Sequence, residues 1–302
     1  MPFEKMTRLK YPPRLWGLMG YPGSGKSSFA AQMHGPLLVV DSDHRFTEVL
    51  DLAGEREVYQ LSGNASDHAS PDRIAAILSR EMPGSKIKTI VVDSLTAIIT
   101  PFVTQAMVDK DAGREKNLAS AFRIKALAMR QLQDAVTKWG TDVLWIYHLM
   151  DARDAQGKAL VRATVSQTEL ARLARSINLQ LQIVQEGERR GIKVVWARRG
   201  RSGMTLWDEN SRWDKMPEKI EQAVYDGLSE ADQERIESEI PDAFPNPESA
   251  IAWGFEQGAF LSLEQATHAY NQLKTACLPK SAKEMAGIWI SEVHSRLMSK
   301  RP

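Results

Sequence analysis

The segment at residues 20–27, which reads GYPGSGKS, limits the possible folds more than any other part of the chain. It places a glycine, four residues and then Gly-Lys-Ser, which is the spacing of a phosphate-binding loop. We expect residues 14–19 (RLWGLM) to form a buried strand before the loop and residues 28–33 (SFAAQM) to open a short helix after it. Such a loop surrounds a phosphate with backbone N–H groups, and the helix N-terminus adds a favourable dipole. The sequence therefore predicts a nucleoside triphosphate site.

The residues of this loop have distinct expected roles. The Lys26 ammonium should reach the β- and γ-phosphates, and the Ser27 hydroxyl should bind Mg²⁺. A second magnesium ligand is expected at the end of a neighbouring buried strand, where Asp93 closes Thr89–Asp93 (TIVVD), although Asp93 could instead cap the next helix. The residues expected to hold the nucleotide are Gly20, Tyr21, Pro22, Gly23, Ser24, Gly25, Lys26, Ser27 and Ser28.

Hydrolysis of a bound triphosphate needs a group that orients and deprotonates the attacking water. Asp43, just past the apolar strand Leu37–Asp41 (LLVVD), is the first candidate and Asp41 is the second. Either carboxylate could instead serve only the strand end or the loop.

Composition is that of an ordinary globular protein, because 43% of the 302 residues are hydrophobic and 25% are charged. No run of 18 apolar residues occurs, so we expect no membrane span. The first residues lack the apolar centre of a signal peptide. The single Cys277 permits neither an internal disulfide nor a cysteine-cluster metal site, which favours a reducing cytoplasm.

Charge is distributed unevenly along the chain. Residues 1–217 hold 31 Lys and Arg against 24 Asp and Glu, whereas residues 218–302 hold 8 against 14. This difference favours a polyanion-binding core beside an acidic segment with another task, although it could also be ordinary scatter of solvated charge.

The pattern of strands and helices predicts the domain organisation. We interpret residues 1–13 as an N-terminal arm, 14–217 as the core, 218–246 as an acidic linker region and 247–302 as a C-terminal module of three helices. Apolar strands alternate with helices in the core, including one expected over 118–138, which predicts an α/β fold with a doubly wound, mostly parallel sheet. Residues 178–184 and 192–197 should form a β-hairpin at a sheet edge, with Arg189 and Arg190 in its turn.

Several motifs occur in an order that resembles a known family. The chain contains GYPGSGKS, LLVVDSDH, TIVVDSLTAIITP, DVLWIYHLM and GIKVVWARRGR. In this it resembles the RecA-type recombinase core, and most closely the RecA-like P-loop single-strand annealing proteins of bacteriophages. The similarity covers about residues 14–205. The phosphate loop and VVDSLTAI are its most specific parts.

The resemblance implies catalytic roles for Lys26, Asp43, His148 and Arg198. In the family, a strand-end Asp-x-Glu-His segment supplies the catalytic glutamate. Residues 41–44 read DSDH, so Asp43 takes the glutamate's position with a side chain one methylene shorter, and we expect slow hydrolysis. His148 follows the DVLWI strand at the position of a polar sensor of the γ-phosphate, but it could also be an ordinary strand-end histidine.

The family completes its site across a subunit interface, which implies a homo-oligomer in the form of a ring or a filament. Basic residues after the KVV strand would act as a finger on the neighbour's triphosphate. They could alternatively touch DNA phosphates or face solvent. The candidates are Arg198, Arg199 and Arg201.

Two aperiodic segments, 109–117 and 150–167, lie where RecA-like proteins place their DNA-binding loops. Residues 151–201 hold 11 basic and 5 acidic side chains, a balance that suits the phosphates of single-stranded DNA. The second loop lacks aromatic residues, so we expect binding led by the DNA backbone. The candidate DNA-binding residues are Arg153, Lys158, Arg162, Arg172 and Arg175.

Taken together, the resemblance implies a protein that uses ATP and Mg²⁺, binds single-stranded DNA, promotes strand annealing or pairing and hydrolyses ATP slowly. It would act in the cytoplasm, that of a bacterial host if a phage encodes it. An ATP-gated DNA-binding scaffold without significant hydrolysis and a RecA-like helicase or regulatory ATPase are the alternatives. The C-terminal module could bind a host single-strand-binding protein, gate the DNA groove or only stabilise the core.

Overall fold

The computed structural model describes residues 9–61, 64–115, 118–153 and 156–226, together with residues 249, 252 and 253. The chain divides into two compact units. The first comprises Met1–Arg190 and Asp208–Pro217, and the second comprises Gly191–Trp207 and Glu218–Pro302. The helices expected over 247–302 lie almost wholly outside the described residues, as does most of the expected N-terminal arm.

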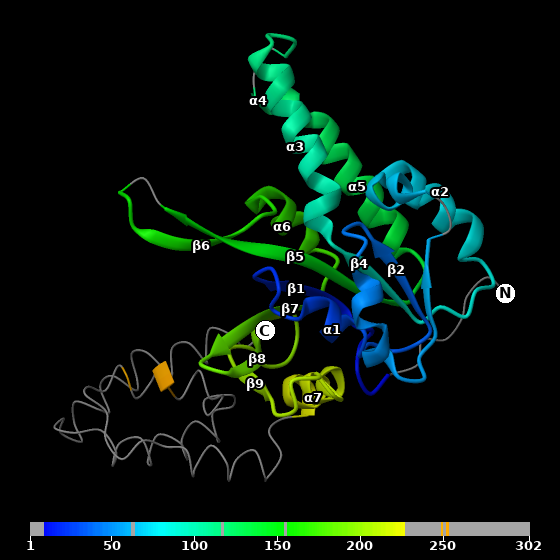
Figure 1. Cartoon of the computed structure of the whole chain (residues 1–302), viewed down its shortest axis with the longest axis vertical. Helices are drawn as coiled ribbons and strands as arrows, with labels where there is room; N and C mark the ends of the chain where they lie inside the picture. The colour runs from blue at the N-terminus through cyan, green and yellow to red at the C-terminus, as the bar shows by residue number, and fades with distance from the viewer. Residues whose placement is uncertain are drawn as a thin grey trace. The chain divides into compact units, whose positions relative to one another are not determined.

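The first unit is built on a parallel sheet with the strand order β3-β2-β4-β5-β1-β7 (Figure 1). Neighbouring strands along this path run parallel, so their carboxyl ends share one edge of the sheet. The expected doubly wound, mostly parallel arrangement is confirmed. The strands are β1 (Leu15–Gly20), β2 (Leu37–Asp41), β3 (Val58–Gln60), β4 (Thr89–Asp93), β5 (Asp142–Arg153) and β7 (Leu179–Glu186).

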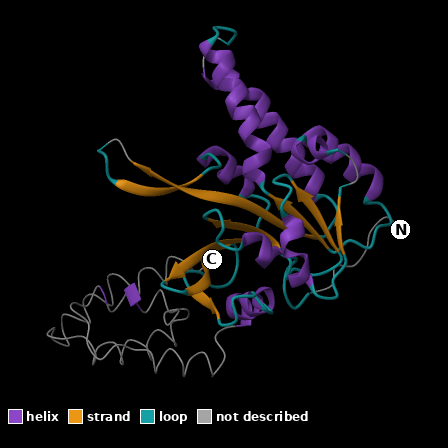
Figure 2. Cartoon of the chain, in the orientation of Figure 1, coloured by secondary structure: helices purple, strands orange, loops and turns teal. Residues whose placement is uncertain are grey.

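Helices cover this sheet and bury its apolar side chains. Trp145 of β5, Ile74 of α2 and Leu132 of α5 are fully buried in one cluster. Helices α3 and α5 lie side by side and project beyond the sheet (Figures 1 and 2). The helices are α1 (Lys26–Ala30), α2 (Pro71–Glu81), α3 (Leu95–Asp111), α4 (Leu118–Ala121), α5 (Arg123–Thr137) and α6 (Gln167–Leu173), with the 3-10 helices η1 (Phe46–Ala53) and η2 (Ala65–Ala69).

The single helix expected over 118–138 is interrupted. Phe122 has φ −82° and ψ 1°, outside the helical region, so α4 ends before it and α5 begins after it. The buried face of α5 includes Met129, Leu132 and Val136, which recur at helical spacing.

Strand β5 continues past the parallel sheet into a two-stranded ribbon. Its first part pairs with β1 as far as His148, and Leu149–Arg153 pair antiparallel with β6 (Ala159–Ala163). Figure 1 shows the β5–β6 ribbon extending away from the sheet. The prediction of an aperiodic loop over 150–167 is therefore wrong. Most side chains of the ribbon are exposed or half-buried, so neither strand needs the apolar face by which a strand is recognised in a sequence.

The remaining elements are strands β8 (Arg189–Ala197) and β9 (Thr205–Asp208) and helices α7 (Met216–Glu221) and η3 (Gln222–Asp226). The start of the predicted linker, residues 218–226, is therefore helical. Gly187 and Glu188 make the turn from β7 to β8, with Gly187 at φ 58°. Arg189 and Arg190 are therefore the first residues of β8, not turn residues as predicted. In the second unit, the Val194 N–H donates to the Met204 carbonyl at 2.9 Å, which closes the β8–β9 connection.

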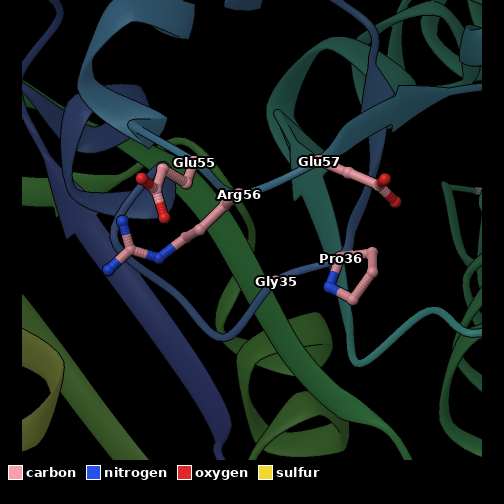
Figure 3. Close-up of a pocket in the computed structure, with 5 residues that line it drawn as sticks. All are labelled: Gly35, Pro36, Glu55, Arg56 and Glu57. Carbon is pink, nitrogen blue, oxygen red and sulfur yellow. The ribbon is translucent and has the colours of Figure 1, made fainter.

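A hollow of about 590 Å³ lies at the amino ends of β2 and β3 (Figure 3). Its lining is Gly35, Pro36, Glu55, Arg56 and Glu57. A Cβ on Gly35 would lie 2.8 Å from the Arg56 Cβ, so the two backbones approach closely only because residue 35 is glycine. None of the residues predicted to bind nucleotide lines this hollow. Within the described ranges, no helix combines the length and apolar content that crossing a bilayer requires.

Candidate nucleotide site

Most of the residues predicted to bind a triphosphate meet at the carboxyl edge of the sheet, although Gly20, Tyr21 and Ser24 do not line the cleft there. Parallel pairing sets Asp41 beside Asp93 and Gly20 beside His148. A cleft of about 390 Å³ opens at this edge. Its lining is Pro22, Gly23, Gly25, Lys26, Ser27, Ser28, Asp41, Asp43, Arg45, Glu48, Val49, Asp93 and His148. Motif reading did not identify Arg45, Glu48 and Val49, which come from the start of η1 and the residue before it.

Glycines give the phosphate loop its backbone path. Gly25 has φ 95°, in the left-handed region that favours glycine. A Cβ on Gly20 would lie 2.6 Å from the Ser24 hydroxyl oxygen and 3.2 Å from the Ile183 Cβ, so a side chain there would displace Ser24. Helix α1 begins at Lys26, two residues earlier than predicted, which places Lys26 and Ser27 in its first turn.

The Lys26 ammonium lies against the loop itself. Its Nζ donates to the carbonyl oxygens of Gly20 at 3.1 Å and Tyr21 at 2.7 Å. Burial lowers the pKa of Lys26 to about 8, and the nearby carboxylates of Asp93 and Asp43 oppose that shift. Lys26 therefore stays mainly protonated at neutral pH, which suits a group that neutralises phosphate oxygens.

Ser27 and Asp93 are in direct contact. The Ser27 hydroxyl donates to Asp93 Oδ2 at 2.6 Å, and Asp93 is 5% exposed. Burial raises the pKa of Asp93 to about 6; the Ser27 hydrogen bond opposes this shift, and the negative charges of Asp43 and Asp41 add to it. A hydroxyl and a carboxylate are hard oxygen ligands of the kind Mg²⁺ takes beside phosphates and water. The donor set fits Mg²⁺, whose charge would offset the negative charge gathered around Asp93.

Asp41 and Asp43 have different environments. Asp41 is buried, and its two carboxylate oxygens accept the backbone N–H groups of Arg45 at 3.1 Å and Phe46 at 2.9 Å. Asp43 is exposed to solvent at the cleft, and its Oδ2 accepts the Ser94 hydroxyl at 2.8 Å. Asp41 thus anchors the start of η1, and the geometry favours Asp43 as the carboxylate that can reach a water.

His148 is half-buried where β5 leaves the parallel sheet, and its side chain lines the cleft. Its backbone N–H donates to Thr96 Oγ1 at 3.1 Å, and its carbonyl accepts the Thr164 N–H at 2.9 Å. Burial lowers the pKa of His148, the Lys26 charge lowers it further, and Asp43 opposes them. The imidazole is therefore mainly neutral at neutral pH.

The finger candidates Arg198, Arg199 and Arg201 belong to the second unit. The Arg198 guanidinium lies 5.9 Å from the centre of the Trp196 ring. Burial lowers the pKa of Arg201, whose backbone N–H donates to the Val224 carbonyl at 3.0 Å. Their predicted role across a subunit interface stays a prediction.

The DNA-binding candidates do not form one patch. In the ribbon register, Arg153 pairs with Ala159 and Arg162 pairs with Met150, which places the two arginines on opposite faces. Lys158 lies just before β6. Arg172 of α6 donates its Nη1 to the Ala126 carbonyl of α5 at 2.8 Å, which anchors α6. Arg175 follows the end of α6.

One contact beside the phosphate loop was not predicted from the sequence. Trp213 is fully buried, and its ring meets the ring of Phe29 in α1 edge-on at 6.0 Å. The Arg190 guanidinium lies 5.6 Å from the Trp213 ring centre. A Cβ on Gly25 would lie 3.1 Å from both Trp213 Nε1 and Arg190 Nη1, so these two side chains form a wall behind the loop.

Comparison with known proteins finds a family match to the AAA domain over residues 13–205. No curated protein matches the sequence. The similar solved structures include the RadB recombinase, at 16% identity over 65% of this chain and 87% of that chain with a TM-score of 0.41. They also include a KaiC-like protein from the archaeon Pyrococcus horikoshii OT3, at 16% identity over 62% and 81% with a TM-score of 0.35. The family match and the strand order around the phosphate loop confirm the expected RecA-like P-loop core.

Proposed function

This chain belongs to the AAA domain family, and we propose that it uses ATP and Mg²⁺ to bind single-stranded DNA and to promote strand annealing or pairing, with slow hydrolysis of ATP. The observation that carries the proposal is the cleft where Lys26, Ser27, Asp43 and Asp93 meet. The cleft therefore offers a cation for the phosphates, oxygen ligands for a metal ion and a carboxylate for the attacking water.

Each of these side chains has a proposed task. Backbone N–H groups of the phosphate loop and the first turn of α1 surround the phosphates, and Lys26 neutralises their outer oxygens. Ser27 and Asp93 would hold Mg²⁺, which would supply positive charge to offset the negative charge of the phosphates. Asp43 orients the attacking water and accepts its proton. Aspartate is one methylene shorter than glutamate, and a displacement of about 1 Å can cost on the order of 100-fold in rate, so hydrolysis is slow.

The β5–β6 ribbon supports the DNA part of the proposal. It bears Arg153 and Arg162 and has Lys158 beside it, and its exposed surface could follow a sugar–phosphate backbone. It also begins immediately after His148, whose side chain lines the nucleotide cleft. We propose His148 as the residue that senses the γ-phosphate, and Arg198 as a finger that acts on the neighbouring subunit of a homo-oligomer.

Turnover of ATP with and without single-stranded DNA, combined with annealing of complementary oligonucleotides, tests this function. We expect Mg²⁺-dependent turnover that DNA stimulates, and DNA affinity that falls steeply from low to moderate salt. Asp43→Ala should lower turnover strongly to a measurable residual rate and Asp43→Glu should accelerate it, while both still bind ATP. DNA binding that does not change with salt would contradict the proposal.

A scaffold gated by ATP, without significant hydrolysis, is the second candidate. The short Asp43 side chain at the water-activating position is the observation that favours it. Phosphate release distinguishes the two candidates. The scaffold would show nucleotide-dependent DNA binding and a mass increase on DNA, but it would release no phosphate.

A further inference from the structure

His68 contacts three of the four residues in the segment that carries Asp43. It lies in η2 and is 4% exposed. Its Nδ1 lies 3.2 Å from the Asp41 backbone nitrogen, and its carbonyl oxygen accepts the Ser42 hydroxyl at 3.0 Å. Its ring meets the His44 ring at 5.6 Å between centres. We propose that His68 is a positioning residue that holds residues 41–44 so that the Asp43 carboxylate reaches the cleft; this inference rests on the proposed hydrolysis.

The partners of the His68 ring select one protonation state. Nδ1 faces the Asp41 N–H, so Nδ1 must accept and carries no proton. Nε2 lies 3.1 Å from the Leu61 carbonyl oxygen, which only accepts, so Nε2 carries the proton. The neutral Nε2–H tautomer satisfies both contacts, and a second proton on Nδ1 would face another N–H. The His68 ring thus accepts the Asp41 N–H and donates to the Leu61 carbonyl, and the first of these contacts connects η2 to the end of β2.

The segment after β2 needs this support because its backbone is not part of the sheet. His44 has φ 54°, a left-handed conformation that a side chain seldom adopts without surrounding contacts. The Ser42 N–H donates to the Asp93 carbonyl at 2.7 Å, and Ser94 binds the Asp43 carboxylate. Those contacts hold the segment from the β4 side, and His68 holds it from the other. A substitution keeps the His68 carbonyl that binds Ser42 but removes the ring contacts to the Asp41 N–H and to His44. Loss of the ring would therefore let Asp43 move from the cleft without removing any residue that binds ATP.

Two substitutions distinguish positioning from simple packing. His68→Phe keeps the ring and its contact with His44 but removes both nitrogens. His68→Asn places an amide oxygen near the Nδ1 position, where it can still accept the Asp41 N–H. We expect His68→Phe to lower kcat by roughly 10- to 100-fold with little change in KM, and His68→Asn to retain kcat within about threefold. The exposed His34 provides the control, since His34→Phe should leave kcat unchanged.

A double-mutant cycle with Asp43 supplies the decisive comparison. In the Asp43→Ala background, His68→Phe should cause no further loss of kcat, because the carboxylate that it positions is absent. An equal loss in both backgrounds, equal losses in the Phe and Asn variants, or wild-type kcat in His68→Phe would overturn the proposal.

The ¹⁵N chemical shifts of the His68 ring in the wild-type protein test the same geometry without a variant. We expect the neutral Nε2–H tautomer at neutral pH, and a proton on Nδ1 would overturn the proposal. This measurement does not depend on turnover. If the wild-type protein hydrolyses no ATP with or without DNA, the proposed function fails, while the ring shifts still decide whether His68 holds the Asp43 segment as described.

Discussion

The phenol of Tyr21 donates a 2.6 Å hydrogen bond to Oδ1 of Asp151, which joins the phosphate loop to the β5–β6 ribbon. This hydrogen bond raises the pKa of Tyr21, and desolvation and the Asp151 charge add to the shift. His148, three residues before Asp151 in the same strand, lines the nucleotide cleft. The loop and the ribbon are thus connected through a side-chain hydrogen bond as well as through β5.

Removing the Tyr21 hydroxyl should weaken communication between nucleotide and DNA. In Tyr21→Phe, the increase in affinity for a labelled single strand on addition of ATP should fall by about threefold or more, while ATP affinity changes little. Fluorescence anisotropy with and without ATP measures this effect. Tyr59→Phe is the matched control, because the exposed Tyr59 hydroxyl donates only to the nearby Glu57. Equal behaviour of the two variants would exclude a coupling role for Tyr21.

Magnesium should be required for tight ATP binding. We expect EDTA to weaken ATP affinity of the wild-type protein by at least about tenfold, because Ser27 and Asp93 supply oxygen ligands in contact with each other. Asp93→Asn should bind ATP weakly with or without Mg²⁺. Asp51→Asn, an exposed carboxylate in η1 outside the cleft lining, should retain the wild-type response. Titration calorimetry with and without EDTA gives these affinities.

Trp213 should stabilise both the fold and the phosphate loop. Trp213→Ala removes a fully buried ring beside Phe29, and we expect it to lower the free energy of unfolding by about 3–5 kcal/mol. Trp213→Phe should lose less, since it keeps an aromatic ring there. Trp196→Phe, at a position that is 37% exposed, should change stability by less than about 0.5 kcal/mol. Denaturant unfolding would contradict this prediction if Trp213→Ala matched the wild type.

Replacing Arg162 by alanine should affect DNA binding, whereas replacing Arg172 by alanine should affect stability. Arg162→Ala should weaken binding of single strands and reduce the salt slope by about 1, because its side chain is exposed on the ribbon. Arg172→Ala should mainly reduce stability, since its guanidinium binds the Ala126 carbonyl. DNA titrations at several salt concentrations, with thermal unfolding of both variants, separate the two effects. A loss of salt slope in Arg172→Ala at unchanged stability would instead place Arg172 on the DNA.

Protonation of His148 should destabilise the folded protein. Its folded pKa lies below the ordinary 6.5, so folding favours the neutral ring. The stability that this contributes is present above pH 6.5 and is lost as pH falls through the folded pKa. Between about pH 7.5 and about pH 5.5, the Tm of the wild-type protein should therefore fall more than that of His148→Gln. Equal decreases in Tm would contradict the predicted effect of burial on His148.

The β5–β6 ribbon and strand β4 show what a sequence can and cannot predict about this fold. Strand β4, Thr89–Asp93, was predicted with its observed bounds because a parallel strand covered on both faces is a continuous apolar run. The ribbon was predicted as a loop because most of its side chains are exposed or half-buried, so its sequence lacks a clear apolar face. The hydrophobic pattern of a sequence indicates which side chains are buried, so it does not reveal a strand whose side chains are exposed.

The same distinction applies to the nucleotide site. The sequence by itself determined the phosphate loop and the positions of Asp43 and Asp93, because each follows a local pattern of a few residues around a buried strand. Only the tertiary structure decided that His68 contacts the segment that carries Asp43, that Trp213 lies behind Gly25 and that Tyr21 reaches Asp151. These partners are far apart in the chain and become neighbours only when the strands pair and the helices pack. No local pattern carries such contacts, because the physical forces that create them act between surfaces that exist only in the folded protein.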